Sequence, residues 1–155
     1  MDKSALTQAM KASISEVLEQ MFFMTIDFIG PEKACADPEP DQATIIAKLG
    51  FSGSCCGTFV LLIPAALAQS VAADFLGTTR QSLSQEQVTG TVLEMVNMLA
   101  GSTLSTYDHQ ALFNLQIPEL ITINAVRALT GQVADQILVR IQTPESRMTF
   151  QVALQ

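Results

Sequence analysis

Apolar residues recur every three or four positions from Ser84 to Tyr107, in a stretch without proline. That period is typical of an α-helix with one buried side. The sequence therefore predicts a long amphipathic helix, and Ser84 with Gln87 has the spacing of a capping box at its start. Six residues are predicted to face the core: Val88, Val92, Met95, Val96, Leu99 and Thr103.

The opposite side of the same helix carries polar residues and two glycines. A Glu and an Asn three positions apart usually belong to a solvated helix face. Two glycines in a helix interior, however, each cost about 1 kcal/mol relative to alanine. They would admit either a neighbouring helix or the surface of a partner close to the carboxylate and the carboxamide. This stripe spans an arc of about 100° and consists of Glu86, Gly90, Glu94, Asn97, Gly101 and Ser105.

Two further helices are predicted. Apolar spacings of three and four indicate a helix over residues 3–25, whose apolar end from Met21 to Met24 should be buried. Residues 65–76 predict a shorter helix, with Gly77 at its C-cap. Residues 32–42 are acidic and rich in proline, which predicts a surface loop.

Runs rich in Ile, Val, Leu, Phe and Thr predict two β-hairpins, so a helix precedes a hairpin in each half of the chain. Ser52-Gly53-Ser54 is the turn signal of the first hairpin, and Pro144 lies in the turn of the second. Short extended pieces are also expected on either side of Pro118. The hairpins pair residues 43–51 with 56–63 and residues 136–142 with 148–154, and the short pieces are residues 112–115 and 120–124.

Composition narrows the class of protein. A chain of 155 residues fits one domain with a substantial core. It is 48% hydrophobic and 15% charged, and its mean hydropathy is +0.32, which indicates a large apolar surface hidden in the core or in an oligomer interface. Eight scattered Lys and Arg residues and a net charge of −7 argue against a nucleic-acid-binding face.

The sequence predicts a cytoplasmic protein without a membrane span or a bound metal. The longest apolar run, Phe59 to Ala68, contains Pro64 and is much shorter than the roughly 20 residues that cross a bilayer. The N-terminus does not have the pattern of a signal peptide. Three cysteines and one histidine argue against a disulfide framework and leave too few ligands for a metal site.

Three segments of the chain resemble one family. The run Glu94-Met-Val-Asn97-Met-Leu-Ala-Gly101 resembles the signature helix of the CheC/CheX/FliY phosphatases of bacterial chemotaxis. VLEQMFFM at residues 17–24 and LQIPELI at residues 115–121 resemble the segments of CheX-like chains that end the first helix and follow the signature helix.

Two positions refine the resemblance. The CheC branch has a second E-x-x-N on its first helix, whereas Glu16 is followed at the third place by Glu19. The chain is therefore most similar to the CheX branch, which has one site. The family often has Asp or Ser at the place of Gly90.

The resemblance implies a fold for the whole chain. It implies a single CheX-like α/β (α+β) domain over residues 1–155, with a mixed β-sheet, long helices on one face and two pseudo-repeated helix–hairpin halves.

It also implies an activity, namely removal of the aspartyl phosphate from a CheY-like response regulator. Asn97 would orient the attacking water, and Glu94 would pair with a lysine of the partner. Mg²⁺ is expected on the partner's receiver domain, with no cofactor on this chain, and CheX-like proteins often form homodimers. The alternative is a non-catalytic response-regulator-binding or dimeric adaptor module, like the middle domain of FliM. The partner-binding face would consist of Glu86, Gly90, Gly101 and Ser105.

Overall fold

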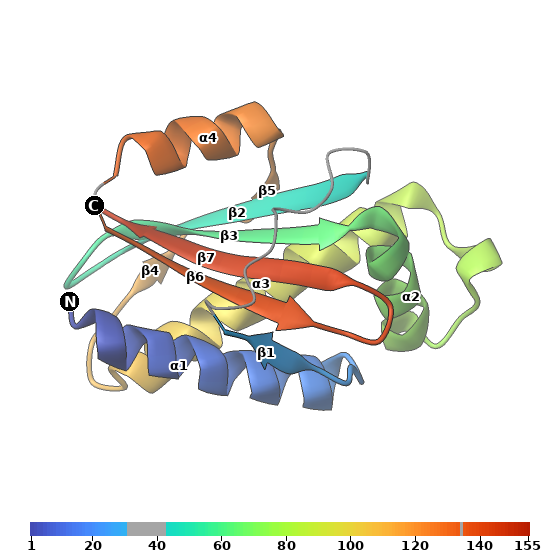
Figure 1. The fold of residues 1–155 in the computed structure, drawn as a ribbon, viewed down its shortest axis with the longest axis horizontal. Helices are drawn as coiled ribbons and strands as arrows, with labels where there is room; N and C mark the ends of the chain where they lie inside the picture. Colours follow the sequence, from blue (N-terminus) through green and yellow to red (C-terminus); the bar gives the residue numbers. More distant parts are fainter. Residues whose placement is uncertain (31–42, 134) are drawn as a thin grey trace.

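The chain folds into a single sheet with helices on both of its faces (Figure 1). The computed structural model describes residues 1–30, 43–133 and 135–155, so the loop predicted at residues 32–42 lies outside the described residues. The helices are α1 (Lys3–Glu16), α2 (Ala65–Leu76), α3 (Gln85–Tyr107) and α4 (Ile123–Gly131), with a π-helical turn at Val17–Met21 and a 3-10 turn at Arg80–Ser82. The strands are β1 (Asp27–Ile29), β2 (Thr44–Ser52), β3 (Gly57–Pro64), β4 (Asn114–Leu115), β5 (Glu119–Leu120), β6 (Asp135–Gln142) and β7 (Arg147–Leu154).

The sheet has the strand order β1-β6-β7-β3-β2-β4, and β5 also pairs with β2. Every strand pairing in the described residues is antiparallel, so the expectation of a mixed sheet was wrong in this respect. For the two pairings within hairpins the reason is local. The longest strands form the two predicted hairpins, β2–β3 and β6–β7, and a short turn can join only antiparallel strands.

The strand order confirms the two pseudo-repeated halves. From either edge, a short strand (β1 or β4) is followed by a hairpin (β6–β7 or β2–β3), and the two hairpins meet where β7 pairs with β3. Each short edge strand pairs with the hairpin of the other half. The duplication is therefore visible in the strand order. Each half supplies the edge strand that pairs with the hairpin of the other half.

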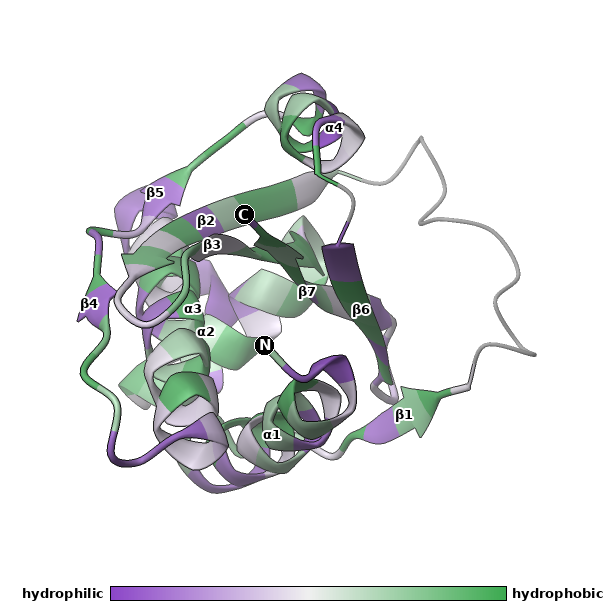
Figure 2. Cartoon of the chain, turned by 90° about the vertical axis from the view of Figure 1, so that its left-hand side faces the viewer, coloured by the Kyte–Doolittle hydropathy of each residue, from purple (hydrophilic) through white to green (hydrophobic). Residues whose placement is uncertain are grey.

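The helices divide unequally between the faces of the sheet (Figure 2). The three long helices pack on one face, as predicted, and α1 and α2 both contact α3. The central strands contribute Phe59 and Phe150 to this core, with the two rings stacked 5.3 Å apart. On the other face, Val126 of α4 packs against Ile46 and Val60 in a smaller cluster.

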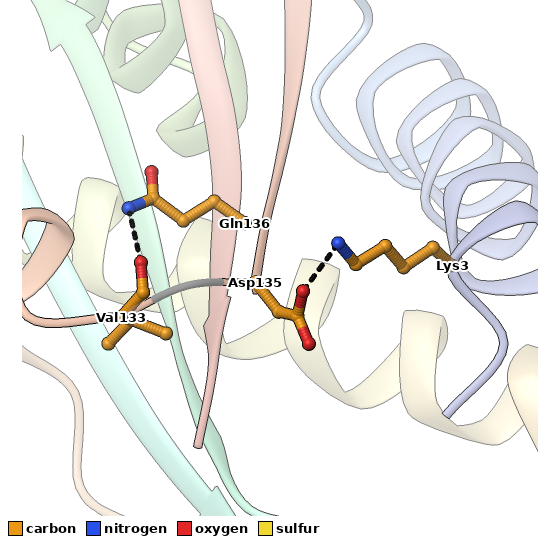
Figure 3. A network of polar contacts seen from close by, with 4 residues as sticks. All are labelled: Lys3, Val133, Asp135 and Gln136. Atoms are coloured by element: carbon orange, nitrogen blue, oxygen red, sulfur yellow. Dashed lines mark hydrogen bonds and ion pairs between the residues drawn. The ribbon is translucent and has the colours of Figure 1, made fainter.

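Polar contacts tie the start of α1 to its surroundings. Lys3 Nζ lies 2.6 Å from Asp135 Oδ1 at the start of β6 (Figure 3). The backbone N–H of Asp2 donates to the hydroxyl of Tyr107, 3.1 Å away, at the end of α3. Exposed contacts of this kind contribute little stability, and the packing of α1 and α3 in the core determines where the two helices lie.

The first helix ends earlier than predicted. The α-helical part stops at Glu16, and a π-helical turn follows. Of the end that was expected to be buried, Phe22 is fully buried, whereas Met21 and Phe23 are 45% and 66% exposed. Phe23 has φ of 58°, the left-handed conformation that glycine usually adopts after a helix. The side chain of Phe23 is therefore exposed, while Phe22 before it belongs to the core and Met24 after it packs against the core.

Strand β1 and helix α4 were not predicted from the sequence. The stretch expected to be extended at residues 120–124 is divided, because β5 ends at Leu120 and α4 begins at Ile123. The side chain of Thr122 caps this helix by accepting from the N–H of Ala125, 3.2 Å away. Helix α4 has only nine residues, so few helical repeats identify it although its apolar and polar residues lie on different sides.

Candidate functional site on helix α3

Helix α3 is fixed at its start and along its inner side. The capping box is reciprocal: Ser84 Oγ accepts from the N–H of Gln87 (3.2 Å), and Gln87 Oε1 accepts from the N–H of Ser84 (2.9 Å). The inner side packs against α1, α2, β2 and β3. The six residues predicted to face the core are each at most 3% exposed, which confirms the prediction for Val88, Val92, Met95, Val96, Leu99 and Thr103.

The opposite side of α3 carries the predicted polar stripe on an open face. Glu86, Gly90, Glu94 and Ser105 are exposed, whereas Asn97 and Gly101 are half-buried. The fold thus brings all six stripe residues together, because a straight helix with one side buried must present the other side to solvent.

Glu94 and Asn97 are available to a partner. Within the residues that the structure describes, neither side chain makes a hydrogen bond or an ion pair. They lie about 60° apart around the helix and about 4.5 Å apart along its axis, so both can reach one small group at once. The carboxylate can accept hydrogen bonds and pair with a cation, and the carboxamide can both donate and accept.

The two stripe glycines are not required by packing within the described chain. A Cβ atom built at Gly90 would meet no heavy atom within 4 Å. One built at Gly101 would lie 3.7 Å from Leu115 Cδ1, which is an ordinary contact. Both residues lie inside a regular helix without a positive φ. Packing within the described residues therefore does not account for the two glycines.

A groove adjoins this face, and the sequence analysis did not find it. The cavity has a volume of about 220 Å³ and lies between the C-terminal half of α3 and the segment that leads into β4. We call it the α3–β4 groove. The sequence signal for this groove was the group of leucines after α3, which predicted only a short extended piece. The lining residues are Gly101, Leu104, Ser105, Asp108, His109, Ala111, Leu112, Phe113 and Leu115.

Two other kinds of feature are absent from the part of the chain that is described. No three His, Cys, Asp or Glu side chains there converge to form a metal site. None of its helices is long and apolar enough to span a membrane.

Comparisons with known proteins decide the family. The sequence matches the family described as "Chemotaxis phosphatase CheX" over residues 45–141, which is more than half of the chain. The chain belongs to this CheX family. No curated protein matches the sequence at a significant level.

Solved structures with the CheX fold cover almost the whole chain. A CheC-like superfamily protein from Shewanella sp. PV-4 has a TM-score of 0.74 and 16% identity, covering 100% of this chain and 99% of that chain. The CheX–CheY–BeF3–Mg²⁺ complex from Borrelia burgdorferi has a TM-score of 0.73 and 18% identity, covering 97% of both chains. CheX from Desulfovibrio desulfuricans has a TM-score of 0.71 and 16% identity, covering 97% of this chain and 99% of that chain. At these identities the likeness shows a shared fold.

The region that matches the CheX family includes all of α3 and therefore Glu94 and Asn97. On α1 and the turn that follows it, Glu16 and Glu19 are both exposed, but no Asn accompanies them. Within the described residues, the E-x-x-N pair therefore occurs on α3 and not on α1.

Proposed function

We propose that this CheX-family protein is a phosphatase that hydrolyses the aspartyl phosphate of a CheY-like response regulator. The observation that carries the proposal is the placement of Glu94 and Asn97, which lie side by side on the open face of a capped helix without partners among the described residues. The complex of CheX with CheY, BeF3 and Mg²⁺ from Borrelia burgdorferi supports the class of partner.

Asn97 orients the attacking water. Phosphoryl transfer needs little covalent chemistry from a catalyst, and most of the gain comes from positioning and electrostatics. A carboxamide is too weak a base to remove a proton, but its oxygen and nitrogen can hold one water in line with the phosphorus. Because Asn97 is half-buried on a helix, its side chain has less freedom to lose when the water is positioned.

Glu94 holds the two proteins in register. Its carboxylate is exposed, and it pairs with a lysine beside the aspartyl phosphate of the receiver domain. Mg²⁺ is bound by the receiver, so the catalytic pair need not include a metal ligand. The remaining stripe residues form the surface that the receiver covers, and they are Glu86, Gly90, Gly101 and Ser105.

The stripe glycines give a first prediction. Gly90→Ala should raise the free energy of unfolding by about 1 kcal/mol, because alanine is the better helix former and the new methyl group meets open space. The same methyl group should lower the affinity for a receiver domain that carries BeF3 and Mg²⁺, because it stands on the docking face. Urea unfolding and calorimetric titration measure the two effects.

Gly131→Ala is the matched control for this prediction. Gly131 also has open space around its Cβ position, but it lies at the end of α4 on the other face of the sheet. Its replacement should leave the receiver affinity unchanged. If Gly90→Ala binds the receiver as tightly as wild type does, Gly90 does not lie under the partner.

The proposed activity is tested by following the loss of aspartyl phosphate from response regulators of the source organism. The regulators are phosphorylated in the presence of Mg²⁺, and the decay is compared with and without the wild-type protein. Acceleration of at least one regulator is the expected result. If the protein binds regulators but accelerates the loss of phosphate from none of them, it belongs instead to the non-catalytic adaptor class.

We also propose that the protein acts in the cytoplasm as a homodimer. The mean hydropathy of +0.32 and several exposed apolar side chains, among them Phe23 and Leu76, support an apolar interface. Sedimentation equilibrium of the purified chain measures the oligomeric state directly.

A further inference from the structure

The α3–β4 groove continues the polar stripe of α3. Gly101 and Ser105 belong to both, and they follow Asn97 at intervals of one helical turn, about 6 Å each. On an ideal helix Leu104 points in nearly the same direction as Asn97, yet it is 3% exposed. The chain that leaves α3 folds back over Leu104 and forms the opposite wall of the groove.

The opposite wall is held in place before any partner binds. The Asp108 carboxylate accepts from the backbone N–H groups of Gln110 and Ala111, both at 3.1 Å. The ring of Phe113 lies edge-on to Phe51 of β2, with centroids 6.1 Å apart. A preformed wall of this kind does not have to be ordered upon binding, so its contacts contribute more of their energy to affinity.

The groove presents apolar surface to solvent. Leu112 is 89% exposed and Leu115 is 39% exposed, and both line it. Ser105, Asp108 and the exposed His109 contribute polar groups to the same lining. An apolar side chain of a partner would gain from this site by burying the exposed leucines.

The usual size of a protein–protein interface indicates which partner reaches the groove. A stable interface buries about 800 Å² on each side, which corresponds to a disc of about 16 Å radius. A receiver domain centred on Glu94 and Asn97 therefore extends beyond Ser105, which is about 12 Å from Asn97 along the helix.

We propose that the α3–β4 groove receives an apolar side chain of the response regulator whose aspartyl phosphate faces Asn97. This inference rests on the proposed function and extends it. Glu94 and Asn97 act at the phosphorylated site, and the groove adds affinity and distinguishes among regulators by the side chain that each presents. Residues of the groove wall therefore affect binding and leave the chemical step unchanged.

Leu112→Asp tests the proposal, with Ile117→Asp as its matched control. Both residues are 89% exposed and lie in the same segment, but Leu112 lines the groove whereas Ile117 does not. Leu112→Asp should weaken binding to the receiver with BeF3 and Mg²⁺ by at least about tenfold and raise KM in proportion. Its kcat should stay at the wild-type value, and Ile117→Asp should match wild type in both measurements.

Other outcomes are distinguishable. Wild-type affinity in Leu112→Asp, or an equal loss in both variants, would overturn the role of the groove and leave the phosphatase intact. A loss of self-association in Leu112→Asp at unchanged receiver affinity would assign the groove to a second copy of the chain and overturn the proposal. A wild-type protein that neither binds nor dephosphorylates any receiver would overturn the proposed function together with this extension.

Discussion

Asn97→Ala is expected to remove the acceleration of aspartyl-phosphate hydrolysis while the protein still binds the receiver domain. Alanine cannot hold the attacking water, and loss of a positioning group of this kind lowers kcat by about a hundredfold or more. Binding persists because Glu94 and the surrounding face are unchanged. Phosphate loss under single-turnover conditions measures the chemical step, and titration with the receiver carrying BeF3 and Mg²⁺ measures the affinity.

Two variants serve as controls for this result. Asn124→Ala removes an exposed carboxamide from α4 on the other face of the sheet and should retain the full rate. Glu94→Ala should lower the affinity more than Asn97→Ala does, because it removes the charge that pairs with the lysine of the receiver. Undiminished turnover by Asn97→Ala would remove the proposed mechanism, whatever the affinity.

The largest expected effect on stability is that of Phe150→Ala. Phe150 is fully buried on β7, at the centre of the sheet, and its ring stacks on Phe59 with centroids 5.3 Å apart. Truncation leaves a cavity between rigid strands and should cost about 3–5 kcal/mol. A domain of this size is stable by only about 5–15 kcal/mol, so the urea midpoint should fall sharply. Circular dichroism during urea titration measures it.

Phe28→Ala is the comparison for that experiment. Phe28 lies on the edge strand β1, is 37% exposed and has Lys11 Nζ 5.7 Å from its ring centroid. Its truncation should cost about 1 kcal/mol, because the ring is partly solvated and makes an exposed cation–π contact. A cost for Phe150→Ala as small as that for Phe28→Ala would show that the central strands repack, contrary to the expected rigid core.

The parts of the fold that depend on local periodicity were predictable. Helix α3 is long, so its buried residues repeat over many turns, and the capping box Ser84–Gln87 marks its start by side chains three positions apart. The two hairpins were predictable for a similar reason, since each has two runs rich in strand-forming residues joined by a short turn. Neither inference needs knowledge of distant contacts.

Strand β1 and helix α4, which were not predicted, depend on contacts with residues far along the chain. The left-handed φ of Phe23 is instead a local feature of the helix end, where the N–H of Met24 donates to the carbonyl oxygen of Leu18, 3.0 Å away. Strand β1 has three residues and exists through its pairing with β6, far along the chain. Helix α4 is stabilised where Val126 meets β2 and β3. Elements this short offer few repeats by which a period can be recognised.

The candidate site divides in the same way. The sequence by itself determined the polar stripe of α3, because the helical period alone places Glu94 and Asn97 on one side and the core residues on the other. Only the tertiary structure decided that this side is open, that Gly90 has free space above it, and that the chain after Tyr107 folds back over Leu104 to form a groove. These are long-range properties, since exposure and cavities depend on which segments pack together, and no local pattern specifies that.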